Sequence, residues 1–236
     1  MTILSGPSDL GRELNLFLVA AIIFALYPGS VQNPLIAREV FEKEKARALQ
    51  IDDDLRNIDI QFTQAIEFRS HGSNEDSLVF NITVRHGKFE RQVLSTSTAN
   101  GDRFNGGYDA FDKMFLLSEY FNGKGKTLTS CEFRDVDRSN CYGLNFTFSK
   151  SSDLSDPLSE VSTTLTANDF TPVTINEQLT DLLLGAEFDN VVKVTYDKDL
   201  NMCYPEKIVM HVYAHLYFLK GELTVVTIKN RNLKKI

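Results

Sequence analysis

The stretch IDIQFTQAIEF, from Ile58 to Phe68, decides the fold class because its side chains alternate in character. Apolar side chains fall on one face of the expected strand: Ile58, Ile60, Phe62, Ile66 and Phe68. Polar side chains fall on the other face: Asp59, Gln61, Thr63 and Glu67. This period of two is typical of an antiparallel strand with one face in the core and the other in water.

The same period recurs along the chain, for example in Leu78–Val84 and Tyr142–Phe148. Gly-containing turns separate such segments: His86-Gly87, Asn100-Gly101, Asn105-Gly106-Gly107, Asn122-Gly123 and Lys220-Gly221. Only Tyr108–Tyr120 has aromatic residues at helical spacing, which predicts a short helix there. Residues 57–236 are therefore predicted to form one mainly β domain, an antiparallel β-barrel or a sandwich of the jelly-roll type.

The segment LNLFLVAAIIFALYPGS, Leu14 to Ser30, is the most apolar part of the chain. As a helix, Leu14–Tyr27 would span roughly 21 Å, which is short against a bilayer core of about 30 Å. A membrane anchor, a signal peptide and a buried helix all remain open, and the anchor is favoured because Arg12 lies between two acids and no positive leader exists. Residues 1–32 are thus predicted to be a tail and membrane anchor. The side chains expected in the membrane are Leu14, Leu16, Phe17, Leu18, Val19, Ile22, Ile23, Phe24, Leu26 and Tyr27.

A helix is predicted next, over residues 33–56, because Asn33-Pro34 suits a helix start and strong helix formers follow. Its apolar stripe looks thin, and Glu39 can pair with Lys43 across one turn. Asp52-Asp53-Asp54 is expected to end it. The sequence therefore predicts an exposed helical spacer between the anchor and the β domain.

The composition is that of a folded protein, with 42% hydrophobic residues, 24% charged residues and a net charge of −7. Nucleic acid is not expected as a partner, because phosphate backbones attract clustered Lys and Arg. The one basic cluster is predicted to be a solvated tail: Lys229, Arg231, Lys234 and Lys235. The three cysteines are predicted to be buried free thiols: Cys131, Cys141 and Cys203.

Motifs for catalysis or metal binding are incomplete. His211 and His215 have the spacing of a zinc-binding helix, but their surroundings predict a strand, in which they would lie about 13 Å apart. The calcium-loop-like run Asp197-x-Asp199-x-Asn201 has Met202 where the turn needs Gly, and it is read as a polar turn. No catalytic residue, cofactor or metal is expected, and the protein is not expected to be an enzyme.

Two sequons, Asn81-Ile-Thr83 and Asn145-Phe-Thr147, occur on the expected polar faces of strands. They make Asn81 and Asn145 candidate glycosylation sites if the β domain enters a secretory lumen.

One stretch carries a family resemblance. DFTPVTINEQLTDLLLGAEFD, Asp169–Asp189, followed by KIVMHVYAHLYF, Lys207–Phe218, resembles the major envelope proteins of white spot syndrome virus, a shrimp virus. The matching parts are a Phe170–Val173 strand, an acidic turn at Asn176-Glu177, and Gly185-Ala186-Glu187-Phe188 before the last strands. The resemblance covers roughly Cys131–Phe218. It implies a β-barrel on an amino-terminal membrane helix, assembled as trimers in the virion envelope.

Three functional hypotheses follow. The favoured one is a membrane-anchored structural protein of the virion envelope that acts in assembly or host attachment. Its expected partners are the membrane, other copies of itself, other virion proteins and a host surface receptor. The alternatives are a secreted β-sandwich binding module with a cleaved signal peptide, and an enzyme with a site assembled from scattered residues.

Overall fold

The computed structural model describes residues 34–70, 76–97, 109–122, 126–134, 136, 141–149, 158–168, 171–181, 186–216 and 219–236. The chain divides into two compact units, Met1–Asn33 and Pro34–Ile236, and only the second contains described residues. Its elements are α2 (Pro34–Arg56), β1 (Ile60–Ser70), β2 (Asp76–Arg85), β3 (Lys88–Thr96), α3 (Asp109–Phe115), the 3-10 helix η2 (Leu117–Phe121), β4 (Thr127–Arg134), β5 (Tyr142–Ser149), β6 (Leu158–Asn168), β7 (Thr171–Asp181), β8 (Ala186–Asp197), β9 (Met202–Leu216) and β10 (Leu219–Lys235).

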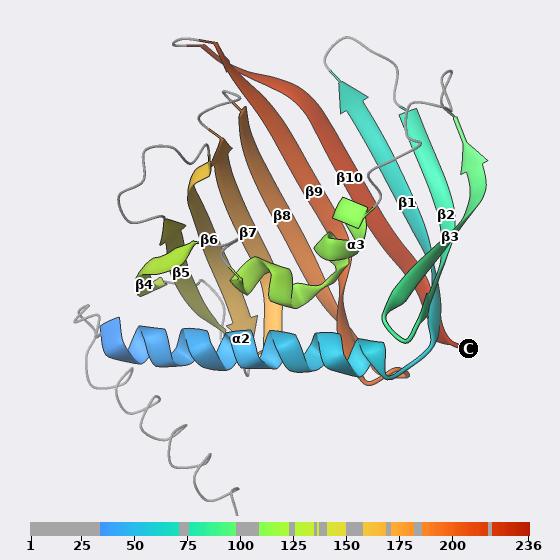
Figure 1. Ribbon diagram of the computed structural model, residues 1–236, viewed down its shortest axis with the longest axis horizontal. Coiled ribbons are helices and arrows are strands. Elements are labelled where there is room, and N and C mark those ends of the chain that lie inside the picture. Colours follow the sequence, from blue (N-terminus) through green and yellow to red (C-terminus); the bar gives the residue numbers. More distant parts are fainter. Residues whose placement is uncertain are drawn as a thin grey trace, which may run out of the picture. The chain divides into compact units, whose positions relative to one another are not determined.

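The strands form one 10-stranded antiparallel sheet in the order β3-β2-β1-β10-β9-β8-β7-β6-β5-β4 (Figure 1). The last strand, β10, lies beside β1, the first strand of the described part of the chain. The prediction of a mainly β, antiparallel fold is confirmed.

The prediction of a sandwich or jelly roll is wrong. The described strands make a single open sheet with β3 and β4 at its ends, and helices rather than a second sheet cover one face. A period of two in the sequence shows that one face of a strand is buried but not what buries it.

Helix α2 is confirmed as a helix, but not as an exposed spacer. Its buried stripe consists of Ala37, Phe41, Glu44, Ala48, Ile51, Asp52 and Leu55. The Phe41 ring lies 4.8 Å from that of Phe146 and 6.0 Å from those of Phe121 and Phe148. The helix therefore packs against the sheet and η2 in the same compact unit as the strands.

The predicted helical interruption is confirmed as α3 followed by η2. Phe115 of α3 stacks on Phe62 of β1 at 4.8 Å, and Phe121 of η2 stacks on Phe146 of β5 at 5.6 Å. These rings add α3 and η2 to the layer that covers the sheet. We call the covered side of the sheet the inner face and the opposite side the outer face.

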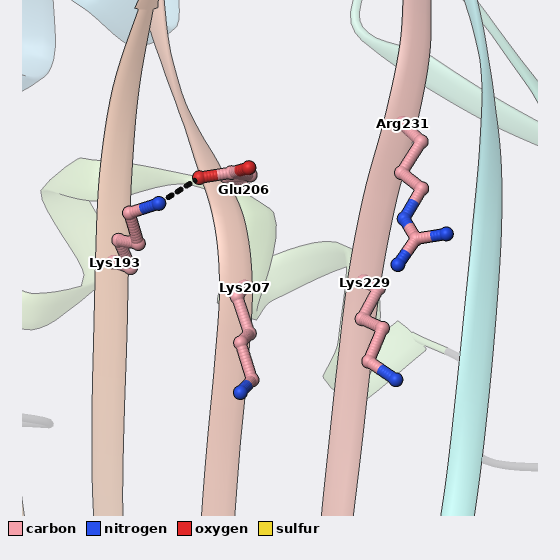
Figure 2. A pocket seen from close by; sticks show the side chains of 5 residues that line it. All are labelled: Lys193, Glu206, Lys207, Lys229 and Arg231. Carbon is pink, nitrogen blue, oxygen red and sulfur yellow. Dashed lines mark ion pairs between the residues drawn. The ribbon is translucent and has the colours of Figure 1, made fainter.

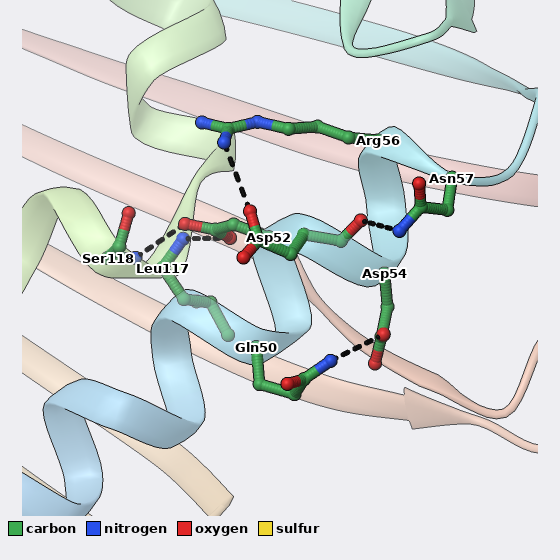
Figure 3. Close-up of polar contacts among 8 residues, drawn as sticks. Gln50, Asp52, Asp54, Arg56, Asn57, Leu117 and Ser118 are labelled. Atoms are coloured by element: carbon green, nitrogen blue, oxygen red, sulfur yellow. Dashed lines mark hydrogen bonds and ion pairs between the residues drawn. The ribbon is translucent and has the colours of Figure 1, made fainter.

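Asp52 joins α2 to η2 (Figure 3). Its two carboxylate oxygens accept hydrogen bonds from the backbone N–H groups of Leu117, at 2.9 Å, and Ser118, at 2.8 Å. These N–H groups belong to the first turn of η2, where backbone N–H groups have no acceptor within the helix itself. Asp52 thus fixes where the short helix begins.

We expect Asp52→Ala to lower the free energy of unfolding by about 2 kcal/mol, because it leaves buried N–H groups without an acceptor. The matched control is Asp54→Ala, which removes an exposed carboxylate whose partner among the described residues is Gln50, at 2.8 Å. That change is expected to cost about 0.5 kcal/mol or less. Chemical denaturation of both variants measures the difference, and equal losses would show that the Asp52 bonds do not hold η2.

The apolar segment Leu14–Tyr27, with the membrane-contacting side chains predicted in it, lies outside the described residues. Among the helices that the structure does describe, none has the length and apolar character to cross a membrane.

Candidate functional site

The inner face is built from rows of side chains that run across the strands in register. One row is apolar from β2 to β4: Leu78, Ile66, Ile228, Ile208, Val192, Ile175, Leu165, Leu144 and Phe133. All of these side chains except the partly buried Phe133 are buried, and burial of each stabilises the fold by about 1.5–3 kcal/mol.

The next row is interrupted by three polar residues, Thr163, Glu177 and Asn190, on the adjacent strands β6, β7 and β8. Phe146 and Met210 continue the row on either side. All three polar side chains are buried, with 1%, 4% and 4% of their surface exposed. We call Thr163, Glu177 and Asn190 the polar row.

The hydrogen bonding of the polar row is incomplete. The Asn190 side-chain N–H donates to Glu177 Oε2 at 3.0 Å. Asn190 Oδ1 and Thr163 Oγ1 have no hydrogen-bond partner within the described structure. A buried polar atom without a partner costs about 1–3 kcal/mol, so the polar row lowers the stability of the fold.

Tyr120 of η2 links the helical layer to the polar row. Its hydroxyl donates to the Met114 carbonyl at 3.0 Å. Burial raises the pKa of Tyr120 well above its ordinary value, and the negative charges of Glu177, Glu119 and Asp52 raise it further. Tyr120 is therefore a neutral phenol, and it lies close enough to Glu177 of the polar row to be affected by its charge.

At the end of the polar row on β9 and β1, and past that row on β8 and β9, the inner face is apolar and partly exposed. The partly exposed side chains are Phe68 of β1, Phe188 of β8, and Met210, Val212 and Ala214 of β9. Val226 of β10 is buried between Phe68 and Met210 in the same row, and Val212 pairs directly with Phe188. We call Phe68, Phe188, Met210, Val212 and Ala214 the apolar patch. In Figure 1, the upper parts of β1, β8, β9 and β10 extend past α2 and α3.

The candidate glycosylation sites Asn81 and Asn145 lie on the outer face of β2 and β5, half-buried in both cases. Asn145 Oδ1 accepts a hydrogen bond from Thr164 Oγ1 at 3.0 Å. Their glycosylation stays a prediction.

The His211–His215 segment is part of strand β9, as predicted. His211 Nδ1 lies 2.6 Å from Glu222 Oε1 of the neighbouring strand β10. The predicted polar turn after Asp197 is also confirmed, because Asp197 Oδ1 accepts from the N–H groups of Asp199 and Leu200. The three cysteines are free thiols, with Cys203 buried and the other two half-buried.

Two sequence predictions need correction here. Asn176-Glu177 is not an acidic turn but the middle of strand β7, with Glu177 inward. The basic cluster from Lys229 to Lys235 is not a tail but part of β10, which pairs with β1 and β9. The polar row was missed, although a Glu between Ile175 and Leu179 on the apolar side of an alternating strand is the signal that marks it.

In comparisons with known proteins, no family model matches the chain, and no curated protein matches it. Three similar solved structures are bacterial. A LolA superfamily protein from Nitrosomonas europaea is 15% identical with a TM-score of 0.35, over 79% of this chain and 92% of that one. A DUF1329 family protein from Desulfovibrio piger is 9% identical with a TM-score of 0.43, over 84% and 92%. An outer membrane lipoprotein-sorting protein domain from Vibrio parahaemolyticus is 9% identical with a TM-score of 0.35, over 82% and 91%.

The resemblance to the viral envelope proteins is therefore wrong. No family model and no curated protein matches the chain, viral envelope proteins included, so the predicted virion role and location in a virion envelope fall with it. The β-sandwich of the alternative hypothesis is wrong as well, because the described strands form one sheet, and the signal peptide that it requires lies outside the described residues. Self-association stays a prediction.

Proposed function

We propose that the protein is a binding protein for an amphipathic ligand with a long apolar chain, which lies on the inner face of the sheet. The observation that carries the proposal is the apolar patch: its side chains continue the buried rows of the core and yet stay partly exposed. Neighbouring apolar side chains that the core leaves partly exposed offer surface to an apolar partner.

The energetics favour an extended apolar partner. Removing apolar surface from water gives about 25 cal/mol per Å², and Phe68, Phe188 and Met210 are the large side chains that would gain most. Methionine adapts its shape to irregular apolar partners because its chain is unbranched. The patch has members on β1, β8 and β9. Phe68 and Met210 lie in one row on either side of the buried Val226, and Val212 pairs with Phe188 in the next row, so a chain laid across the strands would contact side chains from all three strands.

The polar row supports a ligand with a hydrogen-bond donor. Asn190 pairs directly with Met210 across β8 and β9, so its unpartnered Oδ1 belongs to the row that the apolar patch continues. A hydroxyl or amide N–H on the ligand would satisfy this acceptor, and a purely apolar ligand would leave it unpaired.

The proposed function has no catalytic step. Consistent with this, burial raises the pKa of the Cys131 thiol to about 11, so at neutral pH it is a thiol and not a nucleophilic thiolate. Its Sγ donates instead to the Ala37 carbonyl at 3.3 Å, a contact between β4 and α2.

The test is a titration of the delipidated protein with a neutral naphthylamine fluorophore, followed by displacement with a long-chain alcohol. We expect saturable binding, and we expect Val212→Gln to weaken it about tenfold, because the new amide would lie opposite the apolar Phe188, and an amide that the ligand buries without a partner costs about 1–3 kcal/mol. A neutral probe is used so that charged groups elsewhere do not contribute.

The matched control is Val209→Gln, which makes the same change at a half-buried valine of β9 on the outer face. Thermal unfolding confirms that both variants are folded. No saturable binding to the unsubstituted protein, or equal weakening by both substitutions, would contradict the proposal.

A further inference from the structure

The outer face carries three lysines side by side. Lys193 of β8 pairs directly with Lys207 of β9, and Lys207 pairs directly with Lys229 of β10. Neighbouring strands lie about 4.8 Å apart, and like charges directly opposite one another destabilise a sheet. The row therefore costs folding free energy unless negative charge lies close to it.

Negative charge from the protein offsets only part of this row. Glu206 Oε2 lies 2.6 Å from Lys193 Nζ, and Glu67 contacts Lys229 Nζ at 2.6 and 2.9 Å. Within the part of the chain that the structure describes, Lys207 forms no ion pair, and neither does Arg231 on the same face of β10. Four positive charges thus stand against two negative ones, in a chain whose net charge is −7.

These side chains line an open cleft of about 200 Å³: Lys193, Glu206, Lys207, Lys229 and Arg231 (Figure 2). Lys193 and Glu206 point toward one another at one side of it, whereas the Arg231 side chain extends along β10 toward Lys229. The hydrogen bond from Lys193 is the main reason that the pKa of Glu206 lies below its ordinary value, with a further contribution from Thr195. Glu206 is therefore already neutralised by Lys193, and the unbalanced charge lies at Lys207 and Arg231.

We propose that this cleft is a binding site for a phosphoryl group, either as inorganic phosphate or as the phosphomonoester headgroup of a lipid. A phosphate dianion matches the two unbalanced cations in charge. The guanidinium of Arg231 offers paired donors to two phosphate oxygens, and the ammonium groups of Lys207 and Lys229 act as point charges. The site lies on the outer face, so it is independent of the ligand proposed for the inner face.

The test uses the full chain in two arms. In the first, inorganic phosphate is titrated by calorimetry, and thermal unfolding is compared in phosphate and in chloride at equal ionic strength. In the second, sedimentation measures binding to phosphatidylcholine vesicles with and without phosphatidic acid. We expect phosphate to raise the unfolding temperature above that in chloride, because a ligand that binds only the folded state stabilises it.

The variants Lys207→Gln and Arg231→Gln are expected to weaken phosphate binding about tenfold each, as expected for the loss of one charge-assisted hydrogen bond. Lys88→Gln is the control, since Lys88 is an exposed lysine in β3, outside the cleft. Phosphate binding without vesicle retention supports the site with a free phosphate ligand. Retention only on phosphatidic acid vesicles, lost in Lys207→Gln, supports it with a lipid headgroup. No binding in either arm, or equal weakening by Lys88→Gln, overturns the proposal.

Discussion

Phe41→Ala is expected to lower the free energy of unfolding by about 3–5 kcal/mol, the range for removing a large aromatic side chain from a packed core. Phe41 is 1% exposed and makes ring contacts with Phe121, Phe146 and Phe148. Alanine keeps the helix propensity of α2, so the loss would report the packing of α2 on the sheet and not the helix itself. Denaturant unfolding of the purified variant gives the difference.

The matched control is Leu49→Ala on the same helix, because Leu49 is 47% exposed. We expect a loss of about 1 kcal/mol or less there. If both substitutions lower the free energy of unfolding by the same small amount, α2 does not pack on the sheet, and the prediction of an exposed helical spacer would be correct.

The second large effect is a loss of stability with rising pH, caused by Glu44. The Glu44 side chain is buried on α2, and burial raises the pKa of its carboxyl from 4.5 to about 7, against the opposing effect of the hydrogen bond that the Tyr142 hydroxyl donates to it. Its other oxygen, Oε2, has no hydrogen-bond partner within the described structure. The charged form is therefore disfavoured in the folded state.

The sign follows from the raised pKa. Below pH 4.5, Glu44 is neutral in the folded and the unfolded state, and the free energy of unfolding has its full value. Above that pH the unfolded state ionises more readily than the folded state, so this part of the free energy of unfolding is lost as the pH rises through about 7. The full loss is about 3 kcal/mol, since each unit of pKa corresponds to about 1.4 kcal/mol. Glu44→Gln keeps an oxygen that accepts from Tyr142 and cannot ionise, so we expect it to stabilise the protein by up to about 3 kcal/mol at pH 8 and to remove this part of the pH dependence.

The measurement is the free energy of unfolding between pH 4.5 and pH 8 for the unsubstituted protein, Glu44→Gln and the exposed control Glu39→Gln. Glu39 lies on the same helix and pairs with Lys43 at 3.4 Å on the surface. If Glu44→Gln and Glu39→Gln have the same pH profile as the unsubstituted protein, Glu44 is not a buried acid.

The sequence predicts the strands well because alternation is a local property. Ile60, Phe62 and Ile66 are buried as the period of two requires, and the helical interruption after residue 108 follows from its spacing of aromatic residues. The packing of α2 could not be read in the same way. Its stripe depends on Ala37 and Ala48, whose small side chains let the helix approach the sheet but add little to an apolar pattern.

The sites depend on contacts between distant segments, which a single sequence does not display. Lys193, Lys207 and Lys229 form one row only because β8, β9 and β10 pair in that register. The basic residues of β10 were read as a tail because charge alone does not distinguish a solvated end from the outer face of a strand. Glu177 is the exception, since a carboxylate at an inward position of an alternating strand is visible in the sequence itself.

The most direct test of the proposed function is residue-level mapping of a bound ligand. A long-chain alcohol with a photoreactive diazirine in its chain is bound, irradiated, and located by mass spectrometry of the digested protein. We predict adducts on the inner face at Phe68, Phe188, Met210 and Val212, with few at the outer-face neighbours Val191 and Val209. Adducts concentrated on the outer face, or spread without preference between the two faces, would contradict the account.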